Sequence, residues 1–258
     1  MTATLEVENL SKAFGGVRAV RDVSFSVDAG EIVAIIGPNG AGKSSCFNML
    51  GGQLAVDDGR IRLNGRTVTR LGPAAIARAG IGRTFQLARV FGSMTVLENV
   101  QAACLSHARR HTDPFRRGSR QFEARAGALL AEAEMGAAAD TFADHLAYGD
   151  VKRLELAMAF AGDPVLLLMD EPTAGMAPAE RGMLMRHVVR QAKQGGRAVL
   201  FTEHDMDVVF GHAERVLVMD QGAVLAQGPP ETVRDDPRVQ RVYLGTPERP
   251  DETEFAGC

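Results

Sequence analysis

Three short runs of the chain are almost entirely apolar, which is typical of strands buried on both faces of a parallel sheet. They lie at Ile32–Ile36, Val165–Met169 and Ala198–Thr202. Helical patterns at Glu180–Lys193 and Met206–His212 follow the second and third runs. Strands that alternate with helices predict an α/β fold around a parallel sheet.

Other segments alternate between apolar and polar residues, as strands with one exposed face do. These segments are Leu5–Leu10, Val20–Val27, Arg60–Leu63, Thr67–Val68, Arg215–Met219 and Ala223–Ala226. Asn64-Gly65 favours a hairpin, because a type I′ turn needs positive φ at both central residues. A short helix at Pro73–Ala79 and a strand at Ile81–Phe85 complete the first third. We therefore expect an antiparallel β layer beside the first buried strand.

The alternation disappears between Thr95 and Ala161, where the sequence is rich in alanine and predicts an all-helical insert. Thr95 and Glu98 fit a capping box at its start. Helices are expected at Glu123–Met135 and Val151–Ala161. A basic loop at 106–125 is interpreted either as a contact for lipid headgroups or an acidic partner, or as a solvated loop. After the insert the α/β pattern returns, and only the last few residues are expected to be disordered.

Composition excludes several classes of function. The formal net charge of −3 over 258 residues gives no indication of a nucleic-acid partner. Cys46, Cys104 and Cys258 show no metal-ligand spacing and fit a reducing compartment. No signal peptide is visible, and no apolar run approaches the roughly 20 residues that span a bilayer. We expect a soluble protein that acts at a membrane only through a partner.

The candidate chemistry begins where the first buried strand runs into a glycine-rich turn and then a helix from Cys46 to Leu50. The turn fits the phosphate-binding P-loop pattern G-x-x-x-x-G-K-[ST]. Glycines let backbone N–H groups face phosphate oxygens, and the helix adds its positive end. Lys43 is expected on the β- and γ-phosphates of ATP, and the Ser44 hydroxyl on Mg²⁺. The expected nucleotide-binding residues are Gly37, Asn39, Gly40, Ala41, Gly42, Lys43, Ser44 and Ser45.

Two carboxylates, Asp170 and Glu171, directly follow the second buried strand. Ligands bind at the carboxyl ends of parallel strands, so Asp170 is placed to hold Mg²⁺ as in a Walker B motif. Glu171 is the candidate that polarises the attacking water, a general-base role typically worth about 10²–10⁴ in rate. The alternative is that both acids are exposed strand-end residues.

Two further candidates are weaker on position alone. His204 follows the third buried run, where an imidazole can donate to a γ-phosphate oxygen. A lone histidine is nevertheless more often structural. Gly149 lies at the start of a helix, which is an anion site by the dipole argument. A simple helix cap is the competing interpretation and is favoured by position alone.

Together these motifs resemble the ATP-binding subunit of ABC transporters over almost the whole chain. GPNGAGKSS is similar to Walker A, VLLLMDE to Walker B, and LAYGD to the signature motif usually written LSGGQ. The resemblance implies that Phe14 stacks on adenine and that Gln86, in the Q-loop, serves both the metal and catalysis. It also implies that His204 senses the γ-phosphate and that Ala174–Ala177 form the D-loop.

Within that family, the chain is most similar to the larger ATPase subunit of branched-chain amino acid importers. The segments that carry this closer likeness are RTFQLARVFGSMTVLENV, LAYGDVKRLELA, TEHDMDVV and VQRVYLG. The implied division is an ATP-binding core with an antiparallel β subdomain at 1–86 and 162–230, a helical signature subdomain at 87–161 and a tail at 231–258.

The resemblance also implies partners. Two cassettes enclose two ATP molecules, and Tyr148 and Gly149 of one subunit contact the nucleotide held by the other. Transmembrane permease subunits dock near Gln86, and a periplasmic solute-binding protein acts indirectly, which places the chain at the cytoplasmic face of the bacterial inner membrane. Three apolar residues are candidates for the permease contact or, equally, for core packing. They are Val90, Phe91 and Met94.

The chain departs from the family pattern at Ala147, where the signature has serine, and at Ala177, where the D-loop usually has aspartate. Both put the rate and the coupling between sites in doubt, while Glu171 and His204 keep hydrolysis expected. Urea or amide import, lipopolysaccharide export, a repair or translation ATPase and a P-loop kinase are the competing functions. The solute, and whether the partner cassette is a second copy, stay open.

Overall fold

The computed structural model of the chain describes residues 3–108 and 122–244. Most of the basic loop and the last residues of the tail, at 109–121 and 245–258, lie outside this part. The strands are β1 (Ala3–Phe14), β2 (Val17–Asp28), β3 (Ile32–Ile36), β4 (Asp58–Leu63), β5 (Arg66–Thr67), β6 (Ile81–Thr84), β7 (Leu166–Asp170), β8 (Ala198–Thr202), β9 (Arg215–Asp220) and β10 (Ala223–Gly228). The helices are α1 (Lys43–Leu50), α2 (Pro73–Ala79), α3 (Val96–Ala108), α4 (Glu123–Glu132), α5 (Tyr148–Ala159), α6 (Pro178–Gly195), α7 (Met206–His212), α8 (Pro230–Arg234) and α9 (Pro237–Leu244).

The three apolar runs become β3, β8 and β7, which lie side by side in the middle of a six-stranded sheet. Its order is β10-β9-β3-β8-β7-β6, and every pair except β10–β9 is parallel. A second sheet, β2-β1-β4-β5, is antiparallel. The expected α/β fold with an antiparallel β layer is confirmed.

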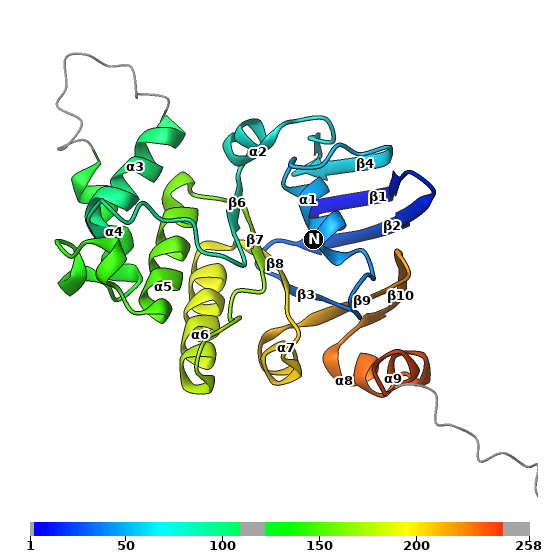
Figure 1. The fold of residues 1–258 in the computed structure, drawn as a ribbon. Coiled ribbons are helices and arrows are strands. Elements are labelled where there is room, and N and C mark those ends of the chain that lie inside the picture. The colour runs from blue at the N-terminus through cyan, green and yellow to red at the C-terminus, as the bar shows by residue number, and fades with distance from the viewer. Residues whose placement is uncertain (1–2, 109–121, 245–258) are drawn as a thin grey trace, which may run out of the picture.

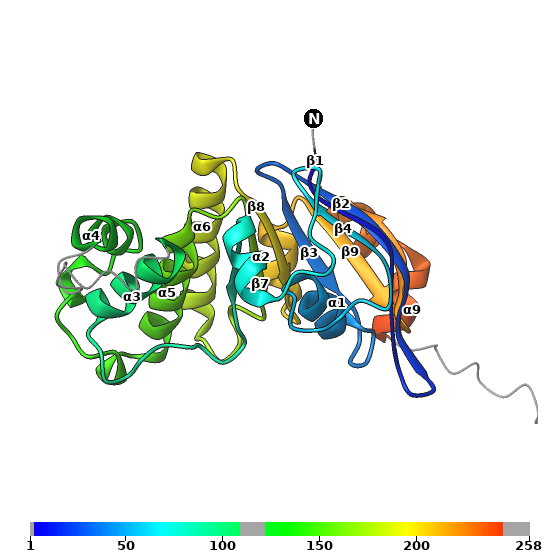
Figure 2. The same cartoon turned by 90° about the horizontal axis from the view of Figure 1, so that it is seen from above.

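Two hydrophobic cores lie on opposite faces of the six-stranded sheet. In β3, Ile32, Ala34 and Ile36 belong to the core shared with the helices from α3 to α7. Val33 and Ile35 point the other way, into the core shared with α1 and the antiparallel sheet. Figures 1 and 2 show the consequence, with α3, α4 and α5 gathered on one side of the molecule and α1 with the antiparallel sheet on the other.

The predicted hairpin and capping box are both present. Asn64 and Gly65 have φ of 47° and 74°, as a type I′ turn requires. The N–H of Thr95 donates to Glu98 at 2.8 Å, and the N–H of Glu98 donates to the Thr95 hydroxyl at 3.2 Å. The hairpin's second strand ends one residue earlier than expected, and Val68 instead donates its N–H to the carbonyl of Ile61 at 2.9 Å.

Several helices begin before the residue that the sequence pattern indicated. Helix α1 begins at Lys43 rather than Cys46, α5 at Tyr148 rather than Val151, and α6 at Pro178 rather than Glu180. Apolar spacing cannot find these first turns, because their polar or exposed side chains carry no hydrophobic period. Each missed turn adjoins a motif, so the correction changes the candidate site.

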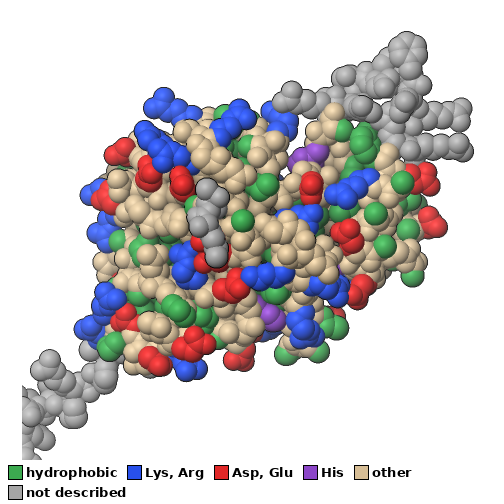
Figure 3. Space-filling view, turned by 180° about the vertical axis from the view of Figure 1, so that it is seen from behind, with side chains coloured by type: hydrophobic (Ala, Val, Ile, Leu, Met, Phe, Trp, Pro, Cys, Tyr) green, Lys and Arg blue, Asp and Glu red, His purple; other side chains and the backbone are tan. Residues whose placement is uncertain are grey.

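The surface seen in Figure 3 has acidic and basic side chains interspersed, with hydrophobic side chains scattered among them. None of the helices in the described ranges combines the length and hydropathy needed to cross a bilayer. Helices α8 and α9 follow the last strand. Val233 and Val239 of these helices are buried in the core shared with the helices from α3 to α7, called here the main core.

Candidate functional site

The glycine-rich turn between β3 and α1 has a backbone that only glycine adopts easily. Gly42 has φ of 97°, and a Cβ on it would lie 2.3 Å from the carbonyl oxygen of Ala19 in β2. Gly40 has φ of 82°, and a Cβ there would meet nothing within 4 Å. The turn is therefore fixed by close packing at one end and open at its tip, as a cradle for phosphate oxygens has to be.

Lys43, the first residue of α1, folds its side chain back over this turn and is buried. Its Nζ donates to the carbonyl oxygens of Gly37 and Pro38 at 2.6 and 3.0 Å. Burial lowers the pKa of Lys43, while the charges of Glu171 and Asp170 act in the opposite direction. The ammonium group thus lies in the field of both Walker B carboxylates, and its contact with phosphates stays a prediction.

Asp170 ends β7 beside the third apolar strand, and both of its oxygens have neighbours. Oδ1 accepts a hydrogen bond from the Thr202 hydroxyl at 2.9 Å, and Oδ2 lies 3.7 Å from Nη2 of Arg83. The sequence interpretation missed Arg83. Its only local mark was its place inside the strand expected at Ile81–Phe85, which does not reveal the carboxylate that it faces.

Glu171 lies between Gln86 and His204, so the structure brings the three predicted catalytic residues together. Its Oε2 accepts from Nε2 of Gln86 at 2.8 Å, and its Oε1 lies 2.7 Å from Nε2 of His204. The backbone of Glu171 has φ of 46°, and its N–H donates to both the carbonyl and the hydroxyl of Thr202 at 3.1 Å. This left-handed turn directs the carboxylate away from the strand toward the two side chains.

Several predicted ligand residues are exposed near the cradle. Asn39 and Ser44 are exposed and Ser45 is half-buried. Phe14, at the end of β1, is 50% exposed, and the Lys12 ammonium lies 5.6 Å from the centre of its ring. A large exposed aromatic ring is available to stack on a flat, apolar group such as a purine base.

Tyr148 and Gly149 lie elsewhere, at the first turn of α5. A Cβ on Gly149 would be 3.2 Å from a carboxylate oxygen of Glu180, and a Cβ on Gly175 would be 3.3 Å from the Tyr148 ring. Their neighbours are thus the D-loop and the start of α6. In both ribbon views α5 lies on the helical side of the molecule, away from α1 (Figures 1 and 2).

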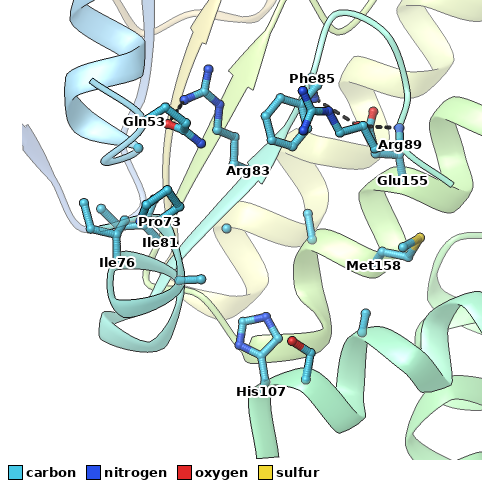
Figure 4. A pocket seen from close by; sticks show the side chains of 16 residues that line it. Gln53, Pro73, Ile76, Ile81, Arg83, Phe85, Arg89, His107, Glu155 and Met158 are labelled. Atoms are coloured by element: carbon cyan, nitrogen blue, oxygen red, sulfur yellow. Dashed lines mark hydrogen bonds between the residues drawn. The ribbon is translucent and has the colours of Figure 1, made fainter. Parts of the chain in front are cut away.

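A hollow of about 310 Å³ lies between α2, β6 and the C-terminal halves of α3 and α5. Figure 4 shows Ile76, Arg83, Phe85, Arg89 and Met158 among the side chains around it. The three apolar residues expected near Gln86 do not line it, and their contact with a permease stays a prediction. Those residues are Val90, which packs against the main core, Phe91, which is 54% exposed, and Met94.

The residues fit ATP and Mg²⁺. The open glycine cradle has room for phosphate oxygens without a Cβ in the way. Ser44, Asp170 and Gln86 offer hydroxyl, carboxylate and amide oxygens, the donor types that Mg²⁺ prefers. When bound, the ion would neutralise phosphate charge, and the chain's own contribution would be to orient these oxygens.

Comparison with known proteins decides the family. Residues 20–174 match the family described as ABC transporter. This chain belongs to the ABC transporter family. Residues 223–249 of the cassette also match a family described as branched-chain amino acid ATP-binding cassette transporter. As a member of the ABC family, it binds nucleotide and hydrolyses ATP as a transporter subunit.

The cassette is similar to several named proteins over nearly its full length. It is 39% identical to the high-affinity branched-chain amino acid transport ATP-binding protein BraF of Pseudomonas aeruginosa, covering 93% of this chain and 97% of that one. It is 38% identical to LivG of Escherichia coli, with the same coverage. A solved cassette of an ABC transporter in its ADP conformation is 32% identical, with a TM-score of 0.84, over 95% of this chain and all of that one.

Proposed function

We propose that this cassette drives the import of branched-chain or related hydrophobic amino acids. Two findings support this solute class: the transport named for BraF and LivG, and the match of residues 223–249 to the branched-chain family. That second match covers β10, α8 and α9, outside the ATP-binding motifs. Urea or amide import and lipopolysaccharide export are the alternatives within the same family.

We propose that Glu171 polarises the attacking water, with Gln86 and His204 orienting its carboxylate. The observation that carries this proposal is the pair of contacts on Glu171, at 2.8 Å to Gln86 and 2.7 Å to His204. Asp170, Ser44 and Gln86 hold Mg²⁺, and Lys43 with the glycine-rich turn holds the phosphates. Phe14 takes the adenine ring.

The same proposal assigns Tyr148 and Gly149 to the nucleotide of a second cassette. Its support is the separation of α5, whose first turn they form, from α1 in the two ribbon views. Transmembrane permease subunits would dock at the hollow beside Phe85, on the cytoplasmic face of the bacterial inner membrane, with a periplasmic solute-binding protein acting from the other side. The division proposed is a core at 1–86 and 162–230, a helical subdomain at 87–161 and a tail at 231–258.

The test of the proposed base is Glu171→Gln, measured as ATP binding and as steady-state hydrolysis. Binding is expected to persist while the rate falls by about 10²–10⁴, because the amide cannot take a proton. Glu123→Gln, at an exposed glutamate in the first turn of α4, is the matched control and should leave the rate unchanged. Hydrolysis by Glu171→Gln at the parent rate would remove Glu171 from this role.

The solute class is tested by uptake into vesicles that contain the reconstituted transporter. Labelled leucine and labelled urea are compared as solutes.

A further inference from the structure

Helix α5 carries two charged side chains that are almost completely buried. Lys152 and Glu155 are 2% and 5% exposed, one turn apart on the same face of the helix. Their nearest charged atoms, Nζ and Oε2, are 4.0 Å apart, too far for a hydrogen bond. Buried charges of this kind are rare unless other groups satisfy them, so their partners define their role.

Those partners are backbone groups on both sides of Gln86. Lys152 donates from Nζ to the carbonyl oxygens of Phe85 and Gln86, at 2.9 and 2.7 Å. Glu155 accepts at Oε1 from the N–H groups of Phe85 and Arg89, at 3.0 and 3.3 Å (Figure 4). Two side chains of the signature helix therefore hold the backbone that presents Gln86 to the catalytic glutamate.

A small cavity lies next to this contact. Its lining consists of buried residues from β6, β7, α5, α6 and the turn after β7: Thr84, Lys152, Glu155, Leu156, Met169, Pro172 and Leu184. The centre of a water molecule has about 10 Å³ there, which is close to the space that one buried water needs.

Two buried polar atoms at this cavity have no hydrogen-bond partner in the described part of the chain: the Thr84 hydroxyl and Oε2 of Glu155. Lys152 has a third N–H beyond the two that bind carbonyls. Burial raises the pKa of Glu155 and lowers the pKa of Lys152, so both charges benefit from a further polar neighbour. One hydroxyl, one ammonium and one carboxylate oxygen supply the two to four partners that a buried water requires.

We propose that one water molecule occupies this cavity, accepting from Lys152 and Thr84 and donating to Glu155, and that Lys152 and Glu155 are positioning residues for Gln86. This inference rests on the proposed role of Glu171, because Lys152 and Glu155 are argued to position the glutamine that contacts it. The start of the same helix carries Gly149. Lys152 and Glu155 therefore fix the position of Gln86 relative to the first turn of α5, which is proposed to contact the nucleotide of the second cassette.

The kinetic test uses Lys152→Met, Glu155→Leu and the double variant in the full chain. Each single change leaves one buried charge unpaired and is expected to lower the thermal unfolding midpoint, whereas the double change removes both charges and regains most of it. Each single change removes two of the four hydrogen bonds to the backbone around Gln86, and the double change removes all four. We expect kcat of the double variant to stay about 10-fold to 10²-fold low, with KM for ATP changed less than about 2-fold.

The matched control is the exposed pair Arg190 and Glu134, whose ion pair at 3.0 Å joins α6 to the residues after α4. Arg190→Met with Glu134→Leu should leave kcat unchanged. Recovery of both the midpoint and kcat in the Lys152 and Glu155 double variant would show a merely structural pair and overturn the positioning role. A parent chain whose hydrolysis is indifferent to Glu171→Gln would instead contradict the proposed function.

The water is tested without any activity measurement. A crystal structure that resolves other buried waters should show one within hydrogen-bond distance of Lys152, Thr84 and Glu155. Thr84→Val keeps the shape of the side chain but removes the hydroxyl, and should weaken or displace that water. A dry cavity in the parent crystal would contradict the water site, and a water unaffected by Thr84→Val would contradict the partner assigned to it.

Discussion

Arg83 connects the end of α1 to Asp170 through one buried guanidinium group. Nη1 donates to the carbonyl of Phe47 and to Gln53 at 3.2 and 2.5 Å, and Nη2 donates to Asn48 at 2.8 Å. Nη2 also lies 3.7 Å from Asp170. Burial lowers the pKa of Arg83, opposed by the charge of Asp170. A fixed cation here orients the carboxylate proposed to hold the metal.

Arg83→Met is expected to destabilise the protein by about 2–4 kcal/mol, because it removes several charge-assisted hydrogen bonds at once. Urea unfolding of the full chain measures the loss. Arg89→Met is the matched control, since this exposed arginine stacks on the same Phe85 ring at 4.3 Å and should cost about 1 kcal/mol or less. Equal losses in the two variants would contradict the structural role of Arg83.

The sequence predicted the residues of the site where a short pattern fixes both residue type and backbone. The glycine-rich turn is such a case, since its glycines have positive φ, a conformation that other residues rarely adopt. It could not predict Arg83, Lys152 or Glu155, because their partners lie dozens of residues away. Those of Arg83 lie on α1 and β7, and those of Lys152 and Glu155 lie in the segment after β6. The hydrogen bond between Gln86 and Glu171, 85 positions later, likewise depends on the pairing of β6 with β7.

At the scale of elements, the buried strands were predictable, and so were the starts of α2, α4 and α7, whereas the starts of α1, α5 and α6 were not. A buried strand is fixed by a continuous apolar run, as in β3, β7 and β8. A helix start depends on caps and on polar first turns, and α6 begins at Pro178 with no polar side chain at its cap residue Ala177. The N–H of Ala177 is instead satisfied by Glu180 at 3.2 Å. The capping box of α3 is the one helix cap that we predicted from residue types.

One contact between elements gives a prediction on pH. Arg215, at the start of β9, donates two hydrogen bonds to Glu31, just before β3, at 2.7 and 2.9 Å. Burial alone raises the pKa of Glu31, but Arg215, the N–H of Asp28 and the charge of Lys193 outweigh it, and the net pKa lies below the ordinary 4.5. A depressed carboxyl pKa stabilises the fold above the unfolded value, and this stabilisation is lost as the pH falls through the folded value.

Glu31→Gln should therefore cost about 1–2 kcal/mol near neutral pH, and the gap to the parent should close as the pH falls below about 4.5. Urea midpoints measured across pH 3–7 or so follow both proteins. Glu123→Gln, at an exposed glutamate, serves as the control and should track the parent throughout. A gap that widens toward low pH would reverse the sign and exclude a depressed pKa for Glu31.

At the scale of the whole molecule, the residues proposed to bind nucleotide fall into two separate groups. The cradle, Asp170, Glu171 and His204 lie at the ends of neighbouring parallel strands, β3, β7 and β8. The signature residues lie on α5 instead, beside Glu180 of α6. This division fits the proposed head-to-tail pair of cassettes, in which each chain would complete the site of the other.

Mixing two inactive variants tests whether two copies of this chain form the pair. Lys43→Met damages the cradle, and Gly149→Asp places a negative charge where the signature loop would meet phosphate. A mixed dimer then has one intact site, built from the Gly149→Asp chain's cradle and the Lys43→Met chain's signature loop. Random pairing of equal amounts would restore about a quarter of the parent ATPase rate if the sites act independently. Each variant alone should stay inactive. Because an aspartate at 149 would lie beside the Glu180 carboxylate, thermal unfolding has to show that each variant is folded at the assay temperature. Mixtures of folded variants that stay inactive would point to a different cassette as the partner.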